Sequence, residues 1–260
     1  MKMSPQISPA ELAVVMPVYN EAANIAAVLE EWFSCLRIVC PNFLLFAVND
    51  GSKDETAKIL ASLQEKLGPR IRVANKMNSG HGLTCRDGYE LALAEGVEWI
   101  FQIDSDGQCD PAFFNTLYRN RTEADCIFGY RRSRDDGFGR IIVSYCCRLL
   151  LWLLTGRYLT DPNVPYRLIR AKALRKALRR VPADFELQNI GLTFALKQHS
   201  ELVWKYFPIH FRARRGGENS INYRKIAKMG INLLRDFRRI THEDTHTWWR
   251  PRWPRRRLAS

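Results

Sequence analysis

The first half of the chain alternates between short apolar runs and longer segments with helical spacing, and this alternation restricts the fold more than any other feature. The apolar runs are rich in β-branched and aromatic residues, as β-strands are, and cover residues 12–16, 43–48, 71–75 and 99–103. After the first run, a helical face is formed by Ile25, Val28, Leu29, Trp32, Phe33 and Leu36. Further helical segments follow the second run, through Leu60, Leu63 and Leu67, and the third run, over residues 83–95. Because parallel strands need crossover helices, these units predict an α/β fold with a mostly parallel sheet flanked by helices.

Polar loops follow these strand-like runs. They read PVYNE (17–21), NDGSKDET (49–56), NKMNSGHG (75–82) and DSDGQ (104–108). In an open α/β sheet, such loops share the carboxyl edge, where ligands bind. Local roles are also expected, with Asn20 and Asp54 as helix N-caps, Gly51 and Gly80 as turn glycines, and His81 as a loop residue near the ligand. Four polar loops on one edge nevertheless predict a binding site better than four separate solvated turns.

The loop DSDGQ carries the clearest chemical signal. A strand-like run precedes it, and Asp110-Pro111 after it is typical of a helix start. Asp104, Asp106 and Gln108 therefore lie in one tight turn, where their side-chain oxygens can converge on a hard cation. Carboxylate and amide oxygens favour Mg²⁺ or Mn²⁺ over Zn²⁺. An acidic turn with solvated carboxylates is the alternative, and the three neighbouring loops favour the metal site over it.

The net charge of +13 is unevenly distributed. Residues 1–118 carry 9 basic and 15 acidic residues, a net charge of −6, whereas residues 119–260 carry 31 basic and 12 acidic residues, a net charge of +19. The second half therefore suits anionic partners such as nucleic acid, acidic lipid headgroups or phosphorylated substrates. No segment of it matches a nucleic-acid-binding motif, so nucleic acid is not an expected partner.

Two segments of the second half suit a membrane surface. The apolar run at 141–154 contains Arg148 and is too short to span a bilayer, so it fits a core helix and a helix in the membrane interface equally well. Residues 246–260 combine three Trp with five Arg, which suits lipid headgroups, although a disordered basic tail is the alternative. We expect no signal peptide or membrane-spanning helix, because no window reaches the ~18 to 20 apolar residues that a span needs. The seven cysteines form no metal or disulfide pattern, which predicts reduced thiols.

The loops PVYNE, NDGS and DSDGQ, in this order after successive strands, resemble those of family 2 glycosyltransferases, which have the GT-A fold. Within that family, DSDGQ with the following DP, the Arg131 region, the R-x-x-x-S start at Arg140, DPNVPYRLIR and PIHFRARRGG resemble the polyprenyl-phosphate sugar transferases, such as dolichyl-phosphate mannose synthase. The likeness covers residues 11–222. It implies an inverting, metal-dependent transfer of a sugar from a GDP- or UDP-linked donor to a dolichyl or undecaprenyl phosphate.

The resemblance also implies roles for individual residues. It places Pro17, Tyr19, Glu21 and Asp50 around the nucleobase and ribose, Asp104, Asp106 and Gln108 around a diphosphate bound to Mg²⁺ or Mn²⁺, and Arg131, Arg140, Ser144 and Arg214 on the acceptor phosphate. Asp104, Asp106, Arg131 and Arg140 are the expected catalytic residues. The sequence departs from the family pattern at Asn49, which replaces the first aspartate of the usual DDGS, and in DPNVPYR, which lacks a Gly-Phe pair before its arginine.

Two other functions remain open from the sequence. A hydroxyl acceptor, as in polysaccharide or glycolipid assembly, needs a general base, and Asp184 or Glu186 could serve. A phosphate acceptor needs positioning instead, because its second pKa of about 6 leaves it largely ionised near pH 7. The arginine-rich second half favours the phosphate. In the other alternative, the basic half of a non-catalytic protein binds a membrane or nucleic acid.

The predicted organisation is a single GT-A domain with a short N-terminal tail and a basic extension. Residues 1–10 form the tail, 11–218 the domain and 219–260 the Trp/Arg-rich, membrane-associating extension. Within the domain, residues 11–118 are the nucleotide-sugar half and 119–218 the acceptor half. We expect a cytoplasmic protein that is peripheral on the cytoplasmic face of a membrane, with an anionic membrane surface and a membrane subunit as further partners.

Overall fold

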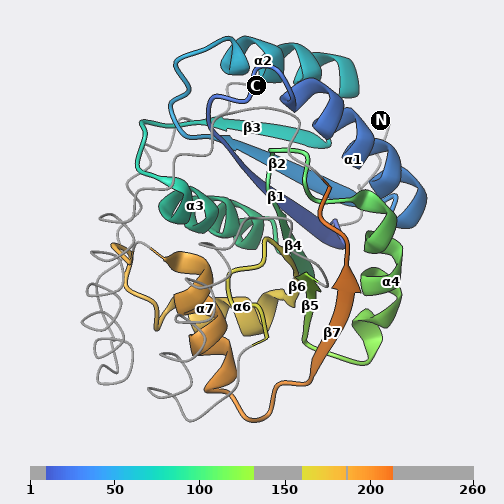
Figure 1. Ribbon diagram of the computed structural model, residues 1–260, viewed down its shortest axis with the longest axis vertical. Helices are drawn as coiled ribbons and strands as arrows, with labels where there is room; N and C mark the ends of the chain where they lie inside the picture. Colours follow the sequence, from blue (N-terminus) through green and yellow to red (C-terminus); the bar gives the residue numbers. More distant parts are fainter. Residues whose placement is uncertain (1–9, 132–159, 186, 213–260) are drawn as a thin grey trace, which may run out of the picture.

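The computed structural model describes residues 10–131, 160–185 and 187–212, which form one sheet with helices on both faces (Figure 1). The strands are β1 (Leu12–Val18), β2 (Phe43–Asn49), β3 (Ile71–Asn75), β4 (Trp99–Ile103), β5 (Cys126–Arg131), β6 (Tyr166–Arg170) and β7 (Trp204–Ile209). Their order in the seven-stranded sheet is β3-β2-β1-β4-β6-β5-β7. Within these ranges β6 is the one strand that runs antiparallel to its neighbours, β4 and β5. The predicted α/β fold with a mostly parallel sheet is confirmed.

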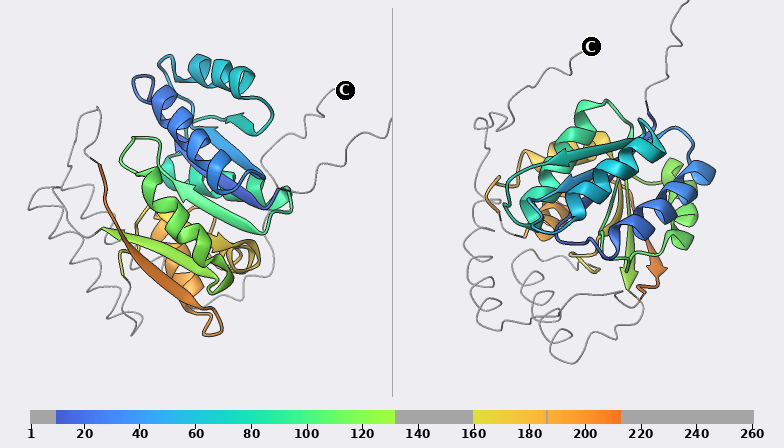
Figure 2. Two further views of the ribbon diagram at one scale, coloured as in Figure 1. Left: turned by 90° about the vertical axis from the view of Figure 1, so that its right-hand side faces the viewer. Right: turned by 90° about the horizontal axis from the view of Figure 1, so that it is seen from above.

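Helices cover both faces of the sheet. They are α1 (Ile25–Val39), α2 (Thr56–Leu67), α3 (His81–Ala94), α4 (Phe114–Arg119), α6 (Ala171–Leu178) and α7 (Gln188–Lys197), with 3₁₀ turns at Pro111–Phe113 and Asn120–Thr122. Helices α1 and α4 lie over one face, and α3, α6 and α7 lie over the other (Figures 1 and 2). Each face of a central strand is therefore covered, which is why every residue of β1 is buried.

The helical faces predicted from the sequence are those that pack on the sheet. All six residues predicted for the face of α1 are buried. Trp32 of this helix packs against Phe101 of β4 and Tyr166 of β6, with ring centroids 5.6 and 6.0 Å apart. Such tilted aromatic contacts add to the burial of apolar area that holds the layers together.

Some helix boundaries differ from the prediction. Asn20 is not an N-cap, because it adopts a left-handed conformation with φ of 51° and α1 begins only at Ile25. Its side chain instead accepts the N–H of Lys53, which joins the loops after β1 and β2. Asp54 does act at the start of α2, since its Oδ1 accepts the N–H of Thr56. Helix α3 begins at His81, two residues before the predicted start.

The strand order places the polar loops beside one another. Strand β1 has β2 on one side and β4 on the other, so the direction of winding reverses between β1 and β4. At such a reversal the loops after the two strands diverge and leave a crevice at the carboxyl edge. Within the described residues, no helix is long and apolar enough to cross a membrane. The apolar run at 141–154 and the extension at 219–260 lie outside those residues.

Candidate active site

A cavity of about 390 Å³ opens at the carboxyl edge of the sheet. It is lined by Pro17, Val18, Tyr19, Glu21, Asp50, Asn78, Gly80, His81, Thr84, Asp104, Ser105 and Asp106. These residues come from the end of β1, from the loops after β1, β2, β3 and β4, and from the first turn of α3. The structure therefore joins the four polar loops in one site, as the sequence predicts.

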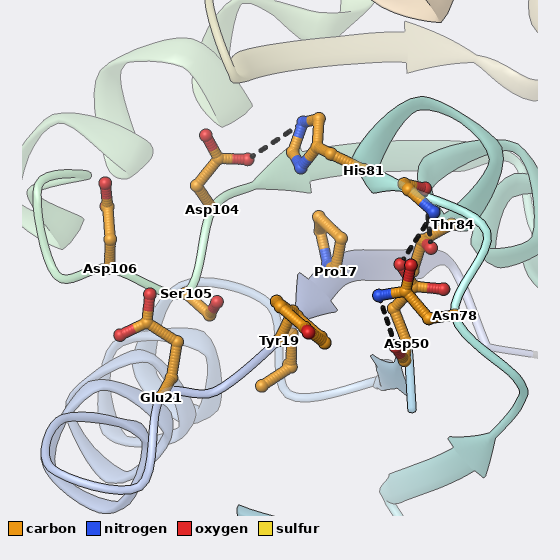
Figure 3. A pocket seen from close by; sticks show the side chains of 12 residues that line it. Pro17, Tyr19, Glu21, Asp50, Asn78, His81, Thr84, Asp104, Ser105 and Asp106 are labelled. Atoms are coloured by element: carbon orange, nitrogen blue, oxygen red, sulfur yellow. Dashed lines mark hydrogen bonds and ion pairs between the residues drawn. The ribbon is translucent and has the colours of Figure 1, made fainter. Parts of the chain in front are cut away.

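The cavity has two chemically different ends (Figure 3). Asp104, Asp106 and Glu21 gather at one end, and Asp50 and Asn78 lie at the other. Tyr19 stands between them, and 42% of this residue is exposed. An acidic end beside an exposed aromatic ring suits a ligand with both a metal-binding anionic part and a flat ring.

Asp104 is the least satisfied carboxylate of the cavity. Its Oδ1 is buried without a hydrogen-bond donor, and Nε2 of His81 lies 3.7 Å away. Burial raises the pKa of Asp104 to about 6, and the nearby charge of Asp106 adds to this increase. The positive charges of His81, Arg167 and Arg131 act in the opposite direction. A carboxylate oxygen without a donor, beside a second carboxylate, is an arrangement that a cation would stabilise.

The donor set fits Mg²⁺ or Mn²⁺. Asp104 and Asp106 supply hard oxygen ligands, and the described residues contain no group of three or more His, Cys, Asp or Glu side chains arranged to enclose a metal. Mg²⁺ is commonly held in this way, by one or two carboxylates together with phosphate oxygens of a substrate and water. The metal expected from the sequence is thus compatible with the cavity, provided that a ligand completes the coordination.

Gln108 lies away from the cavity. Its Nε2 donates to the main-chain carbonyl of Arg212, and its own N–H donates to Oδ1 of Asp106. Gln108 therefore supports the loop from behind, and the side chain predicted as a third metal ligand is not among the lining residues.

Asp50 lines the cavity as predicted, and its carboxylate holds a neighbouring loop. Oδ1 accepts the N–H of Ser79 and the Lys76 ammonium at 2.8 and 3.0 Å, and Oδ2 accepts the N–H of Gly80 at 2.9 Å. Burial raises the pKa of Asp50, but these hydrogen bonds outweigh burial and hold the pKa below its usual value. Asp50 thus fixes the loop that leads into α3.

Glycines allow this close packing of loops. Gly51 and Gly80 have φ of 68° and 92°, which confirms the predicted turn glycines. A Cβ on Gly51 would lie 2.8 Å from the main-chain nitrogen of Asn78.

The side chain of Asn49 forms hydrogen bonds at both ends. Its Nδ2 donates to Oδ1 of Asn75, and its Oδ1 accepts from the main-chain N–H of Ser52. The side-chain amide of Asn49 therefore connects the loop after β2 to the end of β3.

His81 begins α3 and faces the acidic end of the cavity (Figure 3). The Cys85 sulfur lies 3.5 Å from Nε2. Cys85 raises the pKa of His81, burial opposes this, and Asp104 raises it further, so that the pKa lies above its usual value. His81 thus lies beside Asp104 in the lining of the cavity, near the ligand as expected, but it is the first residue of α3 and not part of the loop before it.

Arg131 ends β5 and binds Asp161 instead of entering the cavity. Nε and Nη2 of Arg131 each lie 2.8 Å from an Asp161 carboxylate oxygen, and its guanidinium also lies over the ring of Phe211. Arg131 is not among the lining residues, although its charge acts on Asp104. In this structure the Arg131 guanidinium, predicted to bind an acceptor phosphate, binds the Asp161 carboxylate.

A second arginine near Asp161, Arg167 of the segment DPNVPYR, is fully buried. Arg167 donates to the main-chain carbonyls of Pro162, Val164 and Asn189, so it ties the segment before β6 to the start of α7. Desolvation lowers the pKa of Arg167 below its usual value. Arg167 and Arg131 together fix the segment that carries Asp161.

The remaining predicted residues divide into two groups. Arg140, Ser144 and Arg214, predicted for the acceptor phosphate, lie outside the described residues, as does Glu186. Sequence reasoning did not single out Asn78, Thr84 and Ser105, which also line the cavity. Their loops were recognised, but small polar residues in a loop carry no spacing that shows which of them face a ligand.

Comparisons with curated proteins identify polyprenyl-phosphate enzymes among the relatives. The chain is 27% identical over 170 residues to the dodecaprenyl-phosphate galacturonate synthase of Rhizobium johnstonii, which covers 64% of this chain and 49% of that protein. It is 25% identical over 232 residues to an undecaprenyl-phosphate 4-deoxy-4-formamido-L-arabinose transferase of an Enterobacter species, with coverage of 87% and 66%. The undecaprenyl-phosphate mannosyltransferase of Micrococcus luteus is 24% identical, with coverage of 85% and 91%. The chain spans about half of the first of these relatives and about two thirds of the second.

A solved structure confirms the fold. The glucosyl-3-phosphoglycerate synthase of Mycobacterium tuberculosis, in complex with Mn²⁺, UDP and phosphoglyceric acid, superposes with a TM-score of 0.66. The two proteins are 19% identical, and the match covers 91% of this chain and 80% of the other. At this identity the likeness concerns the architecture, and it confirms the predicted GT-A fold.

The family assignment rests on a match over most of the chain. The model of glycosyl transferase family 2 matches residues 13–181, which include the loops after β1, β2, β3 and β4. The resemblance recognised from PVYNE, NDGS and DSDGQ is thereby confirmed. The chain belongs to glycosyl transferase family 2.

Proposed function

We propose that this protein transfers a sugar from a nucleotide-sugar to the phosphate of a polyprenyl phosphate, with inversion at the anomeric carbon. The observation that carries the proposal is the cavity where four strand ends bring Asp104 and Asp106 beside the exposed ring of Tyr19. Membership in glycosyl transferase family 2 supports an enzyme over a non-catalytic membrane- or nucleic-acid-binding protein. The names of the relatives support a polyprenyl phosphate as acceptor.

The donor is a GDP- or UDP-linked sugar whose nucleoside lies beside Tyr19, toward the end of the cavity that holds Asp50 and Asn78. Pro17 and Tyr19 line this region and Asp50 holds its wall in place, whereas Glu21, also expected near the nucleoside, lies at the acidic end. The diphosphate then lies toward Asp104 and Asp106, where the His81 imidazole lies 3.7 Å from Asp104. The complex of a similarly folded protein with UDP and Mn²⁺ supports a nucleotide donor that binds together with a divalent cation.

Asp104 and Asp106 would hold Mg²⁺ or Mn²⁺ together with the donor diphosphate. A bound divalent cation acts as a Lewis acid that stabilises the negative charge of a leaving diphosphate. The buried Oδ1 of Asp104, which accepts no hydrogen bond and lies 3.7 Å from Nε2 of His81, is the feature of this chain that favours such a cation. Asp106 is held by the N–H of Gln108, which fixes the orientation of its carboxylate.

The acceptor phosphate is an anion near pH 7, so it needs orientation and charge compensation more than a general base. We assign these tasks to Arg131, Arg140, Ser144 and Arg214, as the family resemblance implies. Arginine suits them because its planar guanidinium binds phosphate oxygens at two points. Since Arg131 is engaged with Asp161, the phosphate either shares this guanidinium with the carboxylate or displaces it.

A hydroxyl acceptor is the competing possibility, and it would require a general base. Asp184, one of the two candidates, is exposed and is not among the residues that line the cavity. The other candidate, Glu186, lies outside the described residues, so the preference for a phosphate acceptor rests on the names of the relatives and on the basic second half of the chain.

We also propose that the protein is peripheral on the cytoplasmic face of a membrane, where it reaches its lipid substrate. The basic second half and the Trp/Arg-rich residues 246–260 support this placement, because arginine binds anionic headgroups and tryptophan prefers the interface. A membrane subunit would be a further partner at this surface.

A panel assay tests the proposed function. The protein is incubated with radiolabelled GDP- and UDP-sugars, undecaprenyl or dolichyl phosphate, and Mg²⁺ or Mn²⁺. We expect a labelled lipid that extracts into organic solvent, with an anomeric configuration opposite to that of the donor by NMR. Nucleotide-sugar hydrolysis without a lipid product across the panel would contradict the proposal.

A further inference from the structure

Arg212 joins the end of β7 to the loop that carries Asp104 and Asp106. Its main-chain N–H donates to the main-chain carbonyl of Gln108 at 2.9 Å. In return, the side-chain Nε2 of Gln108 donates to the main-chain carbonyl of Arg212 at 3.3 Å. The adjacent residues, Cys109 after Gln108 and Phe211 before Arg212, form an antiparallel bridge. The acidic loop and the chain after β7 are therefore paired along two successive residues.

The guanidinium of Arg212 strengthens the same junction. Nη1 lies 2.7 and 2.9 Å from the two carboxylate oxygens of Glu31 in α1, and Nη2 lies 2.7 Å from Oδ1 of Asp110. Asp110 directly follows the acidic loop and caps the next turn through the N–H of Ala112. One side chain thus links β7, α1 and the loop, over a separation of 181 residues between Glu31 and Arg212.

This junction reaches the cavity through one intermediate residue. Gln108, whose carbonyl and amide are held by Arg212, donates its N–H to Oδ1 of Asp106 at 3.0 Å. The orientation of the Asp106 carboxylate therefore depends on the main chain that Arg212 fixes. Both terminal nitrogens of the guanidinium are bound to carboxylates, so Arg212 would contact an acceptor phosphate only by giving up or sharing one of these ion pairs.

We infer that Arg212 is a positioning residue that sets the loop of Asp104 and Asp106 for binding a divalent cation and a nucleotide. The expected effects of Arg212 on KM rest on the proposed function, whereas its expected effect on the order of the loop does not. Arg212 acts through Gln108 and Asp110, so its loss should loosen the loop while both carboxylates remain in the chain.

Arg170 provides a matched control. It also binds two carboxylates from different parts of the chain, with Nη1 2.6 Å from Glu98 and Nε 3.0 Å from Asp125. The exposed fractions of the two arginine side chains are similar, at 32% for Arg170 and 29% for Arg212. Arg170 lies at the end of β6 and contacts none of the residues that line the cavity through these pairs. Substitution of Arg170 therefore removes a similar ion-pair junction away from the acidic loop.

The test compares Arg212→Ala, Arg212→Lys and Arg170→Ala with the unchanged protein in three measurements. Hydrogen exchange, read by mass spectrometry on peptides that cover residues 104–112, reports on the loop without any ligand. Calorimetry measures Mn²⁺ affinity in the presence of UDP or GDP. Steady-state kinetics with lipid phosphate separate KM for the donor from KM for the acceptor.

We expect Arg212→Ala to accelerate exchange over residues 104–112 and to weaken Mn²⁺ binding by roughly ten- to a hundredfold, the range expected for lost charge-assisted hydrogen bonds. KM for the donor should rise more than KM for the acceptor. Arg212→Lys should recover part of each effect, since an ammonium reaches fewer oxygens than the guanidinium. Arg170→Ala should leave all three readouts unchanged.

Equal exchange and equal Mn²⁺ affinity in Arg212→Ala and Arg170→Ala would overturn the inference. If Arg212→Ala does not fold, the same measurements are made on Arg212→Lys. Values equal to those of the unchanged protein would then also overturn the inference. If the unchanged protein binds no Mn²⁺ with nucleotide and forms no product, the proposed function fails. The exchange measurement then still decides whether Arg212 sets the loop.

Discussion

Arg131 and Asp161 form a two-point ion pair, in which Nε lies 2.8 Å from Oδ2 and Nη2 lies 2.8 Å from Oδ1. The side chains are 18% and 10% exposed, so neither charge is well hydrated. Asp161 also adopts φ of 42°, a conformation that a non-glycine residue holds only when its surroundings favour it. The pair therefore fixes the segment before β6, whatever Arg131 contributes to the acceptor.

We predict that Arg131→Ala lowers the free energy of unfolding by about 3 kcal/mol, because it removes the two-point ion pair of a poorly hydrated carboxylate. The double variant Arg131→Ala with Asp161→Asn should lose less than the sum of the two single variants, since the side chain at position 161 is then uncharged. Urea unfolding of the four proteins measures this coupling. Additive losses would show that the pair has no net interaction energy.

Asp50 should make the free energy of unfolding depend on pH in the acidic range. Its folded-state pKa lies below the usual value of 3.8, so the stability it contributes is fully present above pH 3.8 and is lost as the pH falls through the folded-state pKa. In Asp50→Asn one of the two acceptor oxygens becomes an NH₂ group, so the side chain can no longer accept from both Ser79 and Gly80. The free energy of unfolding at pH 7 should fall by roughly 1–3 kcal/mol. The difference between the two proteins should shrink below pH 3.8 in urea unfolding curves. A difference that stays constant down to pH 2 would contradict the role of the Asp50 carboxylate.

Removal of a metal ligand should abolish turnover without unfolding the protein. Asp106→Ala is expected to lower the rate on the order of a thousandfold, equivalent to several kcal/mol of transition-state stabilisation. Mn²⁺ with nucleotide should raise the thermal midpoint of the unchanged protein, because it binds the folded state, and should raise that of Asp106→Ala much less. Circular dichroism controls for the fold. Full activity in EDTA would exclude a metal-dependent reaction.

The Trp/Arg-rich end should contribute to membrane binding. Each arginine near an anionic surface contributes about 1 kcal/mol, and salt screens this attraction. Deletion of residues 246–260 should therefore weaken sedimentation with phosphatidylglycerol vesicles at low salt, while nucleotide binding stays unchanged. A shuffled 246–260 sequence of equal composition serves as the control. Equal vesicle binding by the deleted and complete proteins would assign this segment another purpose.

Much of the fold follows from local patterns in the sequence. The helical face that includes Trp32 and the strand-like run at 99–103 have the expected periodicity, because each element is covered by neighbouring layers. The convergence of Asp50, Asp104 and Asp106 is also predictable, since loops after parallel strands share one edge of the sheet.

Other features depend on contacts that no local pattern encodes. The pair of Arg131 with Asp161 spans 30 residues and that of Arg212 with Glu31 spans 181, so charge counts alone could not show that these arginines bind carboxylates of the same chain. Gln108 matches the pattern of a metal ligand, but its amide meets the main chain of Arg212. The left-handed turn at Asn20 likewise arises from contacts with the loop after β2.

The central claim is that the acceptor is a phosphate, and a pair of lipids that differ in this group alone tests it most directly. Initial rates of sugar transfer are measured to undecaprenyl phosphate and to undecaprenol, with the same donor, metal and detergent. The account predicts transfer to the phosphate and at least a thousandfold slower transfer to the alcohol, because the alcohol lacks the anionic oxygen and no general base has been assigned to ionise it. Equal rates, or faster transfer to undecaprenol, would contradict it.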